Sequence, residues 1–279
     1  MRARVQGRRR QMARRLKTLR ARSGLTLDEV AKKMEWSSSK IGRWETGEAL
    51  PEIHGLKSLL DIYGVPLDRW PEILELCRAA RARGWWRALG LDDRGYVPVE
   101  ADACLVQEFT PCYVPGLLQT ADYARALFRA ALHRPTQVQL RQAVSVRMIR
   151  QKRLTSEQDP LLLVTVMDES ALYRPVGGPA VMAEQLAHLV EATALDRVTL
   201  QVLPMSVGAH PCMDGGLFVL SFDRADEPDI ACIEHVLGFT QTEREDRVAR
   251  ARLTFDRLRS DALSPDDSVA LIRKAAERY

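Results

Sequence analysis

A chain of 279 residues and 31.5 kDa with 46% apolar residues is long enough for two folded domains, and its composition is not that of a disordered protein. It has no run of 18 or more apolar residues, no apolar stretch behind its N-terminal arginines and no CxxC pair among its five cysteines, so we expect a cytoplasmic protein with reduced thiols and without membrane contact, metal or cofactor. The formal net charge of +4 is divided unevenly, because residues 1–95 carry 21 basic and 12 acidic residues (net +9) and the remainder is net −5, so a basic first third suits a polyanionic partner.

Five helices are predicted within residues 1–84. The first covers about residues 9–22 and ends at Gly24, a residue that can take a positive φ. The fourth and fifth are expected over residues 51–63 and 68–83. The first 22 residues hold ten basic side chains and no acidic one, so this domain is strongly basic where the chain starts.

Residues 26–46 predict a helix-turn-helix, two short helices joined by a tight turn. Thr26 is placed to cap the first of the pair and Glu29 completes a capping box, while Ser37 is placed to cap the second. Apolar residues at helical spacing give each helix a face for packing: Val30, Ala31, Met34, Ile41 and Trp44. That spacing alone is also typical of an ordinary amphipathic helix pair.

The second helix of the pair presents short polar and basic side chains between its apolar anchors, namely Ser38, Ser39, Lys40 and Arg43. Such a helix can enter the major groove and bond to base edges. Arg43 is the one residue on this face able to contact guanine O6 and N7 together, so we expect it to carry most of the specificity. Arg9 and Arg10 are candidate phosphate contacts, although an arginine run can also be a solvated arm without a partner.

This half of the chain resembles the Xre-type, lambda-repressor-like five-helix DNA-binding domain, through Leu16, Arg20, Gly24, Ala31, Ile41, Trp44, Glu45, Gly47 and Pro51. The resemblance implies that Ser38, Ser39 and Arg43 contact the bases. It also implies that Lys40 and Thr46 contact the DNA backbone. It also implies that Glu45 helps to hold the domain together. Glu35 and Trp36 in the turn depart from the family, which often has glycine and a small polar residue there.

Residues 85–99 form a predicted linker or docking segment, in which Trp85 and Trp86 serve either as a wedge between the halves or as the end of the fifth helix's core. Residues 100–279 predict an α+β domain with a small sheet. Helices are expected over residues 100–109, from 120, and over 138–154, 179–195, 242–258 and 265–278. Strands are expected over residues 161–167, 198–204, 217–222 and 230–236.

Three stretches of the second half, VPGLLQTADYARAL, MDESALYRPVGGPAVMAEQLAHL and VLPMSVGAHPCMDGGLFVLSF, resemble the C-terminal domain of WhiJ-like, antitoxin-like regulators of filamentous soil bacteria. With the first half, the resemblance covers nearly all of residues 8–275. It implies transcriptional control of development or secondary metabolism, and pairing with a small acidic protein encoded by the adjacent gene. It supplies neither catalytic residues nor a settled ligand.

The polar and glycine residues of the second half suggest a ligand or partner site at Asp168, Glu169, Gly177, Gly178 and His210. Asp168 and Glu169 follow a predicted strand, and the glycines join strands to other elements. An enzyme tethered to DNA by the helix-turn-helix is the alternative. However, the sequence has no HExxH, GxSxG or P-loop motif, and an ion pair between Glu169 and an arginine accounts for that carboxylate more simply.

The sequence therefore predicts a transcriptional regulator rather than an enzyme. One helix-turn-helix domain reads few base pairs, so we expect a homodimer on a two-fold double-stranded DNA operator. The acidic second domain is the expected dimer platform, and it would receive a small-ligand or partner-protein signal.

Overall fold

The computed structural model describes residues 5–93, 95–131, 134–224, 227–235 and 238–279. The chain divides into two compact units, one up to Ala88 and one from Leu89 to Tyr279. In the segment predicted as a linker, Trp85–Leu89 forms a 3-10 helix and Tyr96–Glu100 forms the short helix α6. Each unit is described by itself below.

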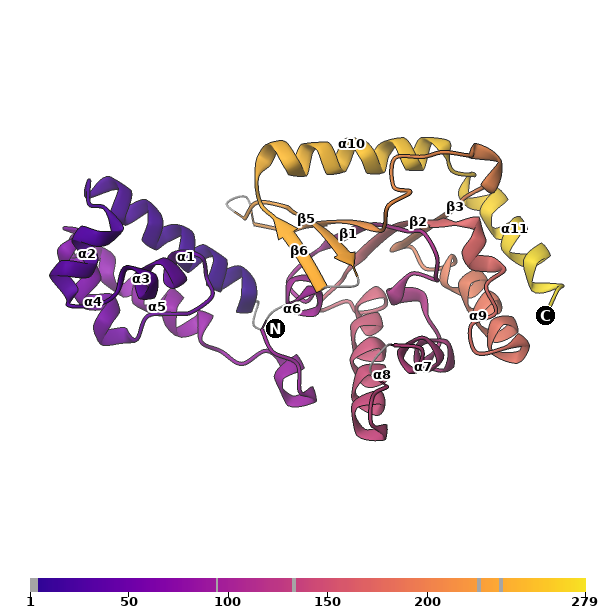
Figure 1. Cartoon of the computed structure of the whole chain (residues 1–279), viewed down its shortest axis with the longest axis horizontal. Coiled ribbons are helices and arrows are strands. Elements are labelled where there is room, and N and C mark those ends of the chain that lie inside the picture. Colours follow the sequence, from indigo (N-terminus) through magenta and orange to yellow (C-terminus); the bar gives the residue numbers. More distant parts are fainter. Residues whose placement is uncertain (1–4, 94, 132–133, 225–226, 236–237) are drawn as a thin grey trace. The chain divides into compact units, whose positions relative to one another are not determined.

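The N-terminal unit is a bundle of α-helices (Figure 1), with α1 at Val5–Arg22, α2 at Leu27–Met34, α3 at Ser38–Glu45, α4 at Ile53–Ile62 and α5 at Trp70–Ala80. All five helices contribute to one core, which includes Met12, Leu16, Val30, Ile41, Trp44, Leu56, Leu60, Ile73 and Cys77. Burial of these apolar side chains is what stabilises helices as short as α2 and α3, since isolated helices of eight residues are unstable in water. The predicted five-helix domain is confirmed.

The ends of α2 and α3 are fixed by local hydrogen bonds. Thr26 Oγ1 accepts from the backbone N–H of Glu29 at 3.2 Å, and Glu29 Oε2 accepts from the N–H of Thr26 at 2.8 Å, so both halves of the capping box form. Ser37 Oγ accepts from the N–H of Lys40 at 3.3 Å and caps α3. Glu35 ends α2 with a φ of 54°, the left-handed conformation that glycine adopts at lower cost.

The C-terminal unit is built on a six-stranded mixed sheet in the order β3-β2-β1-β4-β5-β6. The strands are β1 at Leu105–Thr110, β2 at Leu162–Asp168, β3 at Val198–Leu203, β4 at Leu217–Ser221, β5 at Ile230–His235 and β6 at Gly238–Thr242. β1, β2 and β3 are parallel, whereas β4 runs antiparallel to β1 and β5 and β6 continue the antiparallel half.

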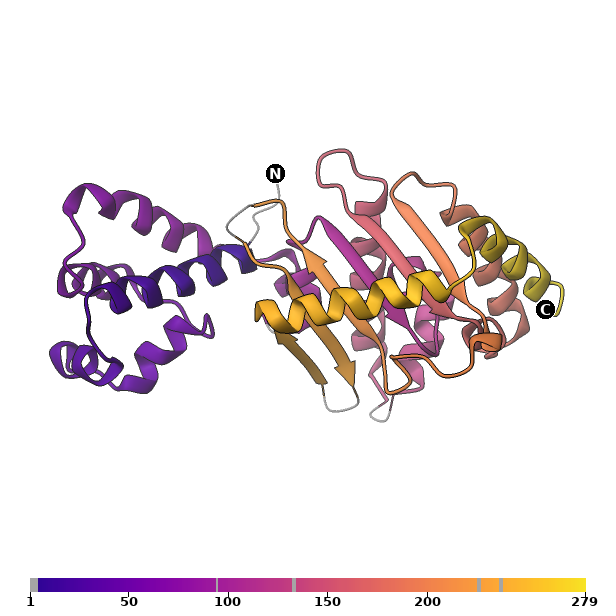
Figure 2. The same cartoon turned by 90° about the horizontal axis from the view of Figure 1, so that it is seen from above.

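Helices cover both faces of this sheet (Figures 1 and 2). One face carries α7 at Ala121–Arg129, α8 at Gln137–Gln151 and α9 at Pro179–Ala192, with α11 at Pro265–Ala276 beside α9. The other face is crossed by α10 at Glu245–Asp261. Separate apolar clusters fill the two sides, as when Val106 packs toward the α9 side and Phe109 toward α10. The predicted α+β class is confirmed.

One prediction about the sheet is wrong, and one strand was not predicted. Residues 100–109 do not form a helix: they end α6 and enter β1, the strand between β2 and β4. The error arises because β1 is covered on both faces and contains the buried Glu108, so it lacks the alternation of a half-exposed strand. β6 was not predicted because its sequence, GFTQT, has few apolar residues and lies at the edge of the sheet.

Candidate nucleic-acid interface

The exposed face of α3 is defined by what its other face buries. Ile41 and Trp44 are 1% and 5% exposed and anchor α3 in the core of the unit. The helical period then turns Ser39, Arg43 and Thr46 outward, and all three are exposed. Their spacing of four and three residues places them in one stripe, which we call the α3 stripe.

Ser38 and Lys40 also lie where the sequence predicts DNA contacts, but both are half-buried and already engaged. The hydroxyl of Ser38 donates to the carboxylate of Asp28 on α2. The ammonium of Lys40 lies 4.1 Å from the ring centroid of Trp36 and 5.4 Å from that of Trp44. A base or phosphate contact by either side chain therefore requires an existing interaction to be exchanged.

An ion pair fixes the end of α3 to α1. Arg20 Nε donates to Glu45 Oε1 at 2.7 Å and its NH2 group donates to Oε2 at 2.8 Å, while NH1 donates to the carbonyl of Leu25 at 3.0 Å. The side chains are 17% and 6% exposed, and the hydrogen bond to Glu45 raises the pKa of Arg20. This two-pronged contact fixes the position of α3 relative to α1. A fixed position of α3 is what the α3 stripe would need to contact DNA in one register.

Trp36 has a packing role that the sequence analysis missed. Its ring meets that of Trp44 edge-on, with centroids 5.1 Å apart and an interplanar angle of 88°. A Cβ atom at Gly55 of α4 would lie 2.8 Å from the Trp36 ring, so a glycine there admits the tryptophan. The signal was a glycine inside a predicted helix, a position where glycine is otherwise unfavourable.

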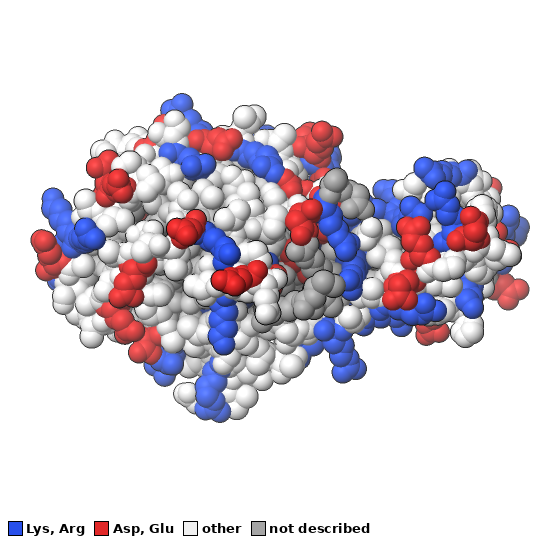
Figure 3. Space-filling model, turned by 180° about the vertical axis from the view of Figure 1, so that it is seen from behind, with Lys and Arg blue, Asp and Glu red and all other residues white. Residues whose placement is uncertain are grey.

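The basic residues from Arg8 to Arg22 lie within α1, and Arg2 and Arg4 lie outside the described residues. Arg9 is half-buried, and its Nε donates to the carbonyl of Ala80 at 3.2 Å, where α5 ends. A cation at a helix C-terminus is favoured by the helix dipole, so this contact also supports the fold. Figure 3 shows basic side chains on this unit with acidic ones between them. Phosphate contact by Arg9 and Arg10 remains a prediction.

In the C-terminal unit, the predicted ligand residues take part in local structure. Asp168 Oδ1 accepts from the N–H of Ser170 at 2.9 Å. The ion pair expected between Glu169 and an arginine is not what the structure shows, because Glu169 Oε2 accepts from the backbone N–H of Met205 at 2.8 Å. His210 meets the ring of Phe109 edge-on, with a centroid distance of 5.2 Å.

Gly177 and Gly178 form the turn that leads into α9. Their φ angles of 74° and 91° are in the left-handed region, and a Cβ at Gly177 would approach Val181 Cγ1 to 2.9 Å. The turn therefore accounts for both glycines. In the part of the chain that the structure describes, no group of three or more His, Cys, Asp or Glu side chains could hold a metal ion. No described helix is both long enough and apolar enough to cross a membrane.

Comparison with known families agrees with this division. Residues 11–84 match the helix-turn-helix domain model, so the chain carries a helix-turn-helix DNA-binding domain. Residues 93–274 match the model described as "Domain of unknown function (DUF5753)", and the chain belongs to this family. No curated protein and no solved structure matches the chain.

Proposed function

We propose that this protein is a sequence-specific transcriptional regulator of the Xre type, which binds a two-fold operator as a homodimer in the cytoplasm. The single observation that carries the proposal is the α3 stripe of Ser39, Arg43 and Thr46. It lies on a helix anchored from behind by Trp44 and clamped at its end by Glu45. A rigid helix with exposed polar and basic side chains is the element that reads the major groove.

The C-terminal unit would receive the signal in this proposal. The WhiJ-like and antitoxin-like resemblance favours a small acidic partner protein, and a small ligand is the other candidate. We assign the unit no catalytic role, because Asp168 and Glu169 accept backbone N–H groups of their own surroundings. Those bonds give both carboxylates a role in local structure, which accounts for them without the DNA-tethered enzyme.

Selection from a random duplex library with the purified full chain tests the proposal. We expect enrichment of one short motif in two inverted copies, centred about one helical turn apart. Chromatin mapping in the source cells should recover the same motif upstream of genes whose transcription changes on deletion. Failure to enrich any motif at physiological salt would contradict sequence-specific binding.

A further inference from the structure

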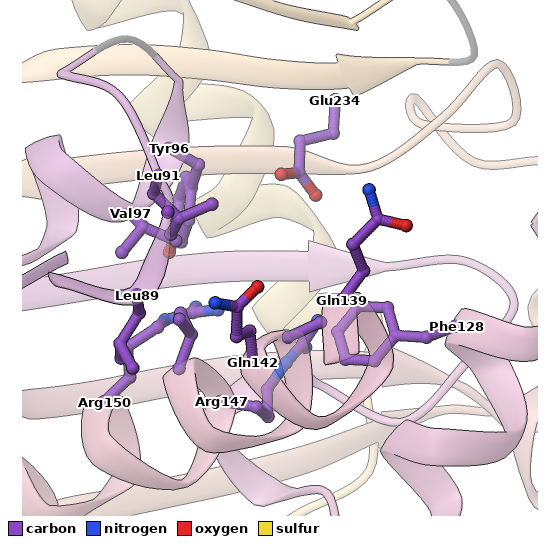
Figure 4. Close-up of a pocket in the computed structure, with 13 residues that line it drawn as sticks. Leu89, Leu91, Tyr96, Val97, Phe128, Gln139, Gln142, Arg147, Arg150 and Glu234 are labelled. Atoms are coloured by element: carbon purple, nitrogen blue, oxygen red, sulfur yellow. The ribbon is translucent and has the colours of Figure 1, made fainter. Parts of the chain in front are cut away.

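The C-terminal unit contains a cavity that no predicted site includes (Figure 4). Its outer lobe, of about 310 Å³, lies among α8, Phe128 of α7, Glu234 of β5 and a group of residues that precede or begin α6, namely Leu89, Gly90, Leu91, Tyr96 and Val97. An inner lobe of about 210 Å³ reaches Glu108 on β1. The two lobes share Tyr96, Arg147, Arg150 and Glu234, so we treat them as one site.

The inner lobe concentrates buried polar atoms that have no hydrogen-bond partner among the described residues. They are Tyr96 OH, Glu108 Oε1, Thr110 Oγ1, Gln119 Oε1 and Arg147 Nε. An unsatisfied buried polar atom costs about 1–3 kcal/mol, and native proteins have few of them. Five such atoms around one cavity indicate a site built for a polar guest.

The two arginines of the cavity differ in how their charge is balanced. Arg150 donates through Nε to Glu100 Oε1 at 2.8 Å and through NH2 to Oε2, so its charge is paired. Arg147 forms no ion pair with any residue in the described ranges. Its guanidinium carbon lies 5.2 Å from the ring centroid of Phe128, and a Cβ at Gly116 would come within 2.2 Å of its NH1 atom.

Burial and the charge of Arg150 lower the pKa of Arg147 to about 10, so this guanidinium still carries its charge at neutral pH. Burial also raises the pKa of Glu108 to about 8, with a smaller contribution from Glu100. Glu108 is therefore mostly protonated near pH 7. In that state its hydroxyl can donate to a guest, while Arg147 offers a fork of donors for one anionic group.

Apolar side chains make up most of the wall of the outer lobe, namely Leu89, Leu91, Val97, Phe128, Ala143 and Val146, and the polar side chains of Gln139, Gln142 and Glu234 also line it. Figure 4 shows Arg147 reaching from α8 toward Phe128 and Glu234 on the opposite side of the cavity. An apolar lobe beside a single unpaired cation fits an apolar body with one negative charge. A phosphate dianion would need more cations than the site supplies.

We propose that this cavity binds a small monocarboxylic acid, with its carboxylate on Arg147 and its apolar chain in the outer lobe. The proposal deepens the signal-receiving role proposed above by naming a site and a ligand class. Binding can be measured without DNA, so its failure would leave the DNA-binding function standing.

The test is calorimetric titration of the full-length chain with straight-chain carboxylates from butyrate to decanoate, with octanamide and octyl phosphate as matched probes. We expect octanoate to bind, and octanamide to bind about tenfold more weakly or not at all. Arg147→Gln should weaken octanoate binding by a similar factor. Arg141→Gln, which removes an exposed arginine of the same helix, should not change it.

Two further readouts keep the test decisive. Ala143→Leu fills part of the outer lobe and should weaken decanoate more than butyrate. Arg147→Gln should keep or raise the melting temperature of the free protein, because it removes a half-buried, desolvated charge that has no ion-pair partner among the described residues. Three results would overturn the proposal: no carboxylate binds, octanamide or octyl phosphate binds as tightly as octanoate, or octanoate binds Arg147→Gln and wild type equally.

Discussion

Some side chains of this protein hold a helix in place, and others are exposed and available to contact a partner. On α3, Trp44 is buried and Glu45 is bound to Arg20, whereas the neighbouring Arg43 is exposed and its side chain forms no hydrogen bond or ion pair with any described residue of its unit. Because Arg43 supports no core contact, its substitution should change recognition without changing the fold.

Arg43→Ala should reduce the binding of the selected operator by about 1–3 kcal/mol and relax one base position in each half-site, since it removes a two-pronged contact to guanine. A gel-shift series against operator variants measures both effects. Arg69→Ala is the matched control, because it removes an exposed arginine outside the helix-turn-helix. Equal losses of binding free energy in the two variants would show that Arg43 contributes through its charge and not through contacts to a base.

Glu108 predicts a pH dependence of stability. Its pKa is raised to about 8 in the folded chain by burial first and then by Glu100, with Glu234 adding to the shift and Arg150 and Arg147 opposing it. Below the ordinary glutamate pKa the shift adds nothing to the pH dependence of stability, and its unfavourable contribution grows as pH rises toward 8, because only the unfolded chain releases the proton.

Glu108→Gln, which resembles the protonated acid, should therefore gain stability over wild type between pH 5 and pH 8. The tyrosines that face the same cavity, Tyr96 and Tyr113, have raised pKa values and stay neutral across this range. Urea unfolding midpoints at steps of one pH unit measure the difference. A constant difference from pH 5 to pH 9 would contradict the shifted pKa.

Single elements carry the argument from packing to function. α3 has eight residues, so its position depends on the core behind it and on the Arg20–Glu45 clamp between α3 and α1. The α3 stripe can meet DNA in one register only if this clamp and the apolar anchors hold together.

Glu45→Ala should lower the free energy of unfolding of the N-terminal unit by about 1.5–3 kcal/mol, since it leaves the guanidinium of Arg20 without its charged partner. Thermal unfolding followed by tryptophan fluorescence can report the change, because Trp36 and Trp44 lie in this unit. Glu48→Ala, an exposed glutamate just beyond α3, serves as the control. Similar melting temperatures for the two variants would argue against a structural role of the clamp.

The elements also show how far sequence reasoning reaches. The capping signals at Thr26 and Ser37 predicted the helix-turn-helix because they act over three residues and need no tertiary partner. β1 was wrongly predicted as a helix because its partners β2 and β4 come later in the chain and because the buried Glu108 interrupts its apolar pattern. The cavity was not predicted for a related reason: Arg147 lies within the helix predicted over residues 138–154, and only the fold shows that it lines a cavity together with Glu108.

At the scale of the whole molecule, the uneven charge suits two tasks. The first 95 residues have a net charge of +9, which favours contact with DNA. The remaining residues have a net charge of −5 and therefore do not compete with them for the DNA backbone. One helix-turn-helix unit reads only a few base pairs, so the proposed function requires two copies on one operator.

We therefore expect sedimentation velocity on the selected operator to give a complex of two chains, twice 31.5 kDa plus the duplex. A duplex with one half-site scrambled should bind more weakly and more sensitively to salt, because nonspecific phosphate contacts remain on that side. One chain per operator at micromolar protein would contradict the dimer.

Methylation interference on the selected operator tests the central claim, base reading by the α3 stripe, most directly. Methylation of guanine N7 removes one of the two acceptors that Arg43 would contact. We predict that wild type is blocked by methylation of one particular guanine in each half-site and that Arg43→Ala binds methylated and unmethylated duplexes alike at that position. The same guanine interference in both proteins, or none in either, would contradict the account.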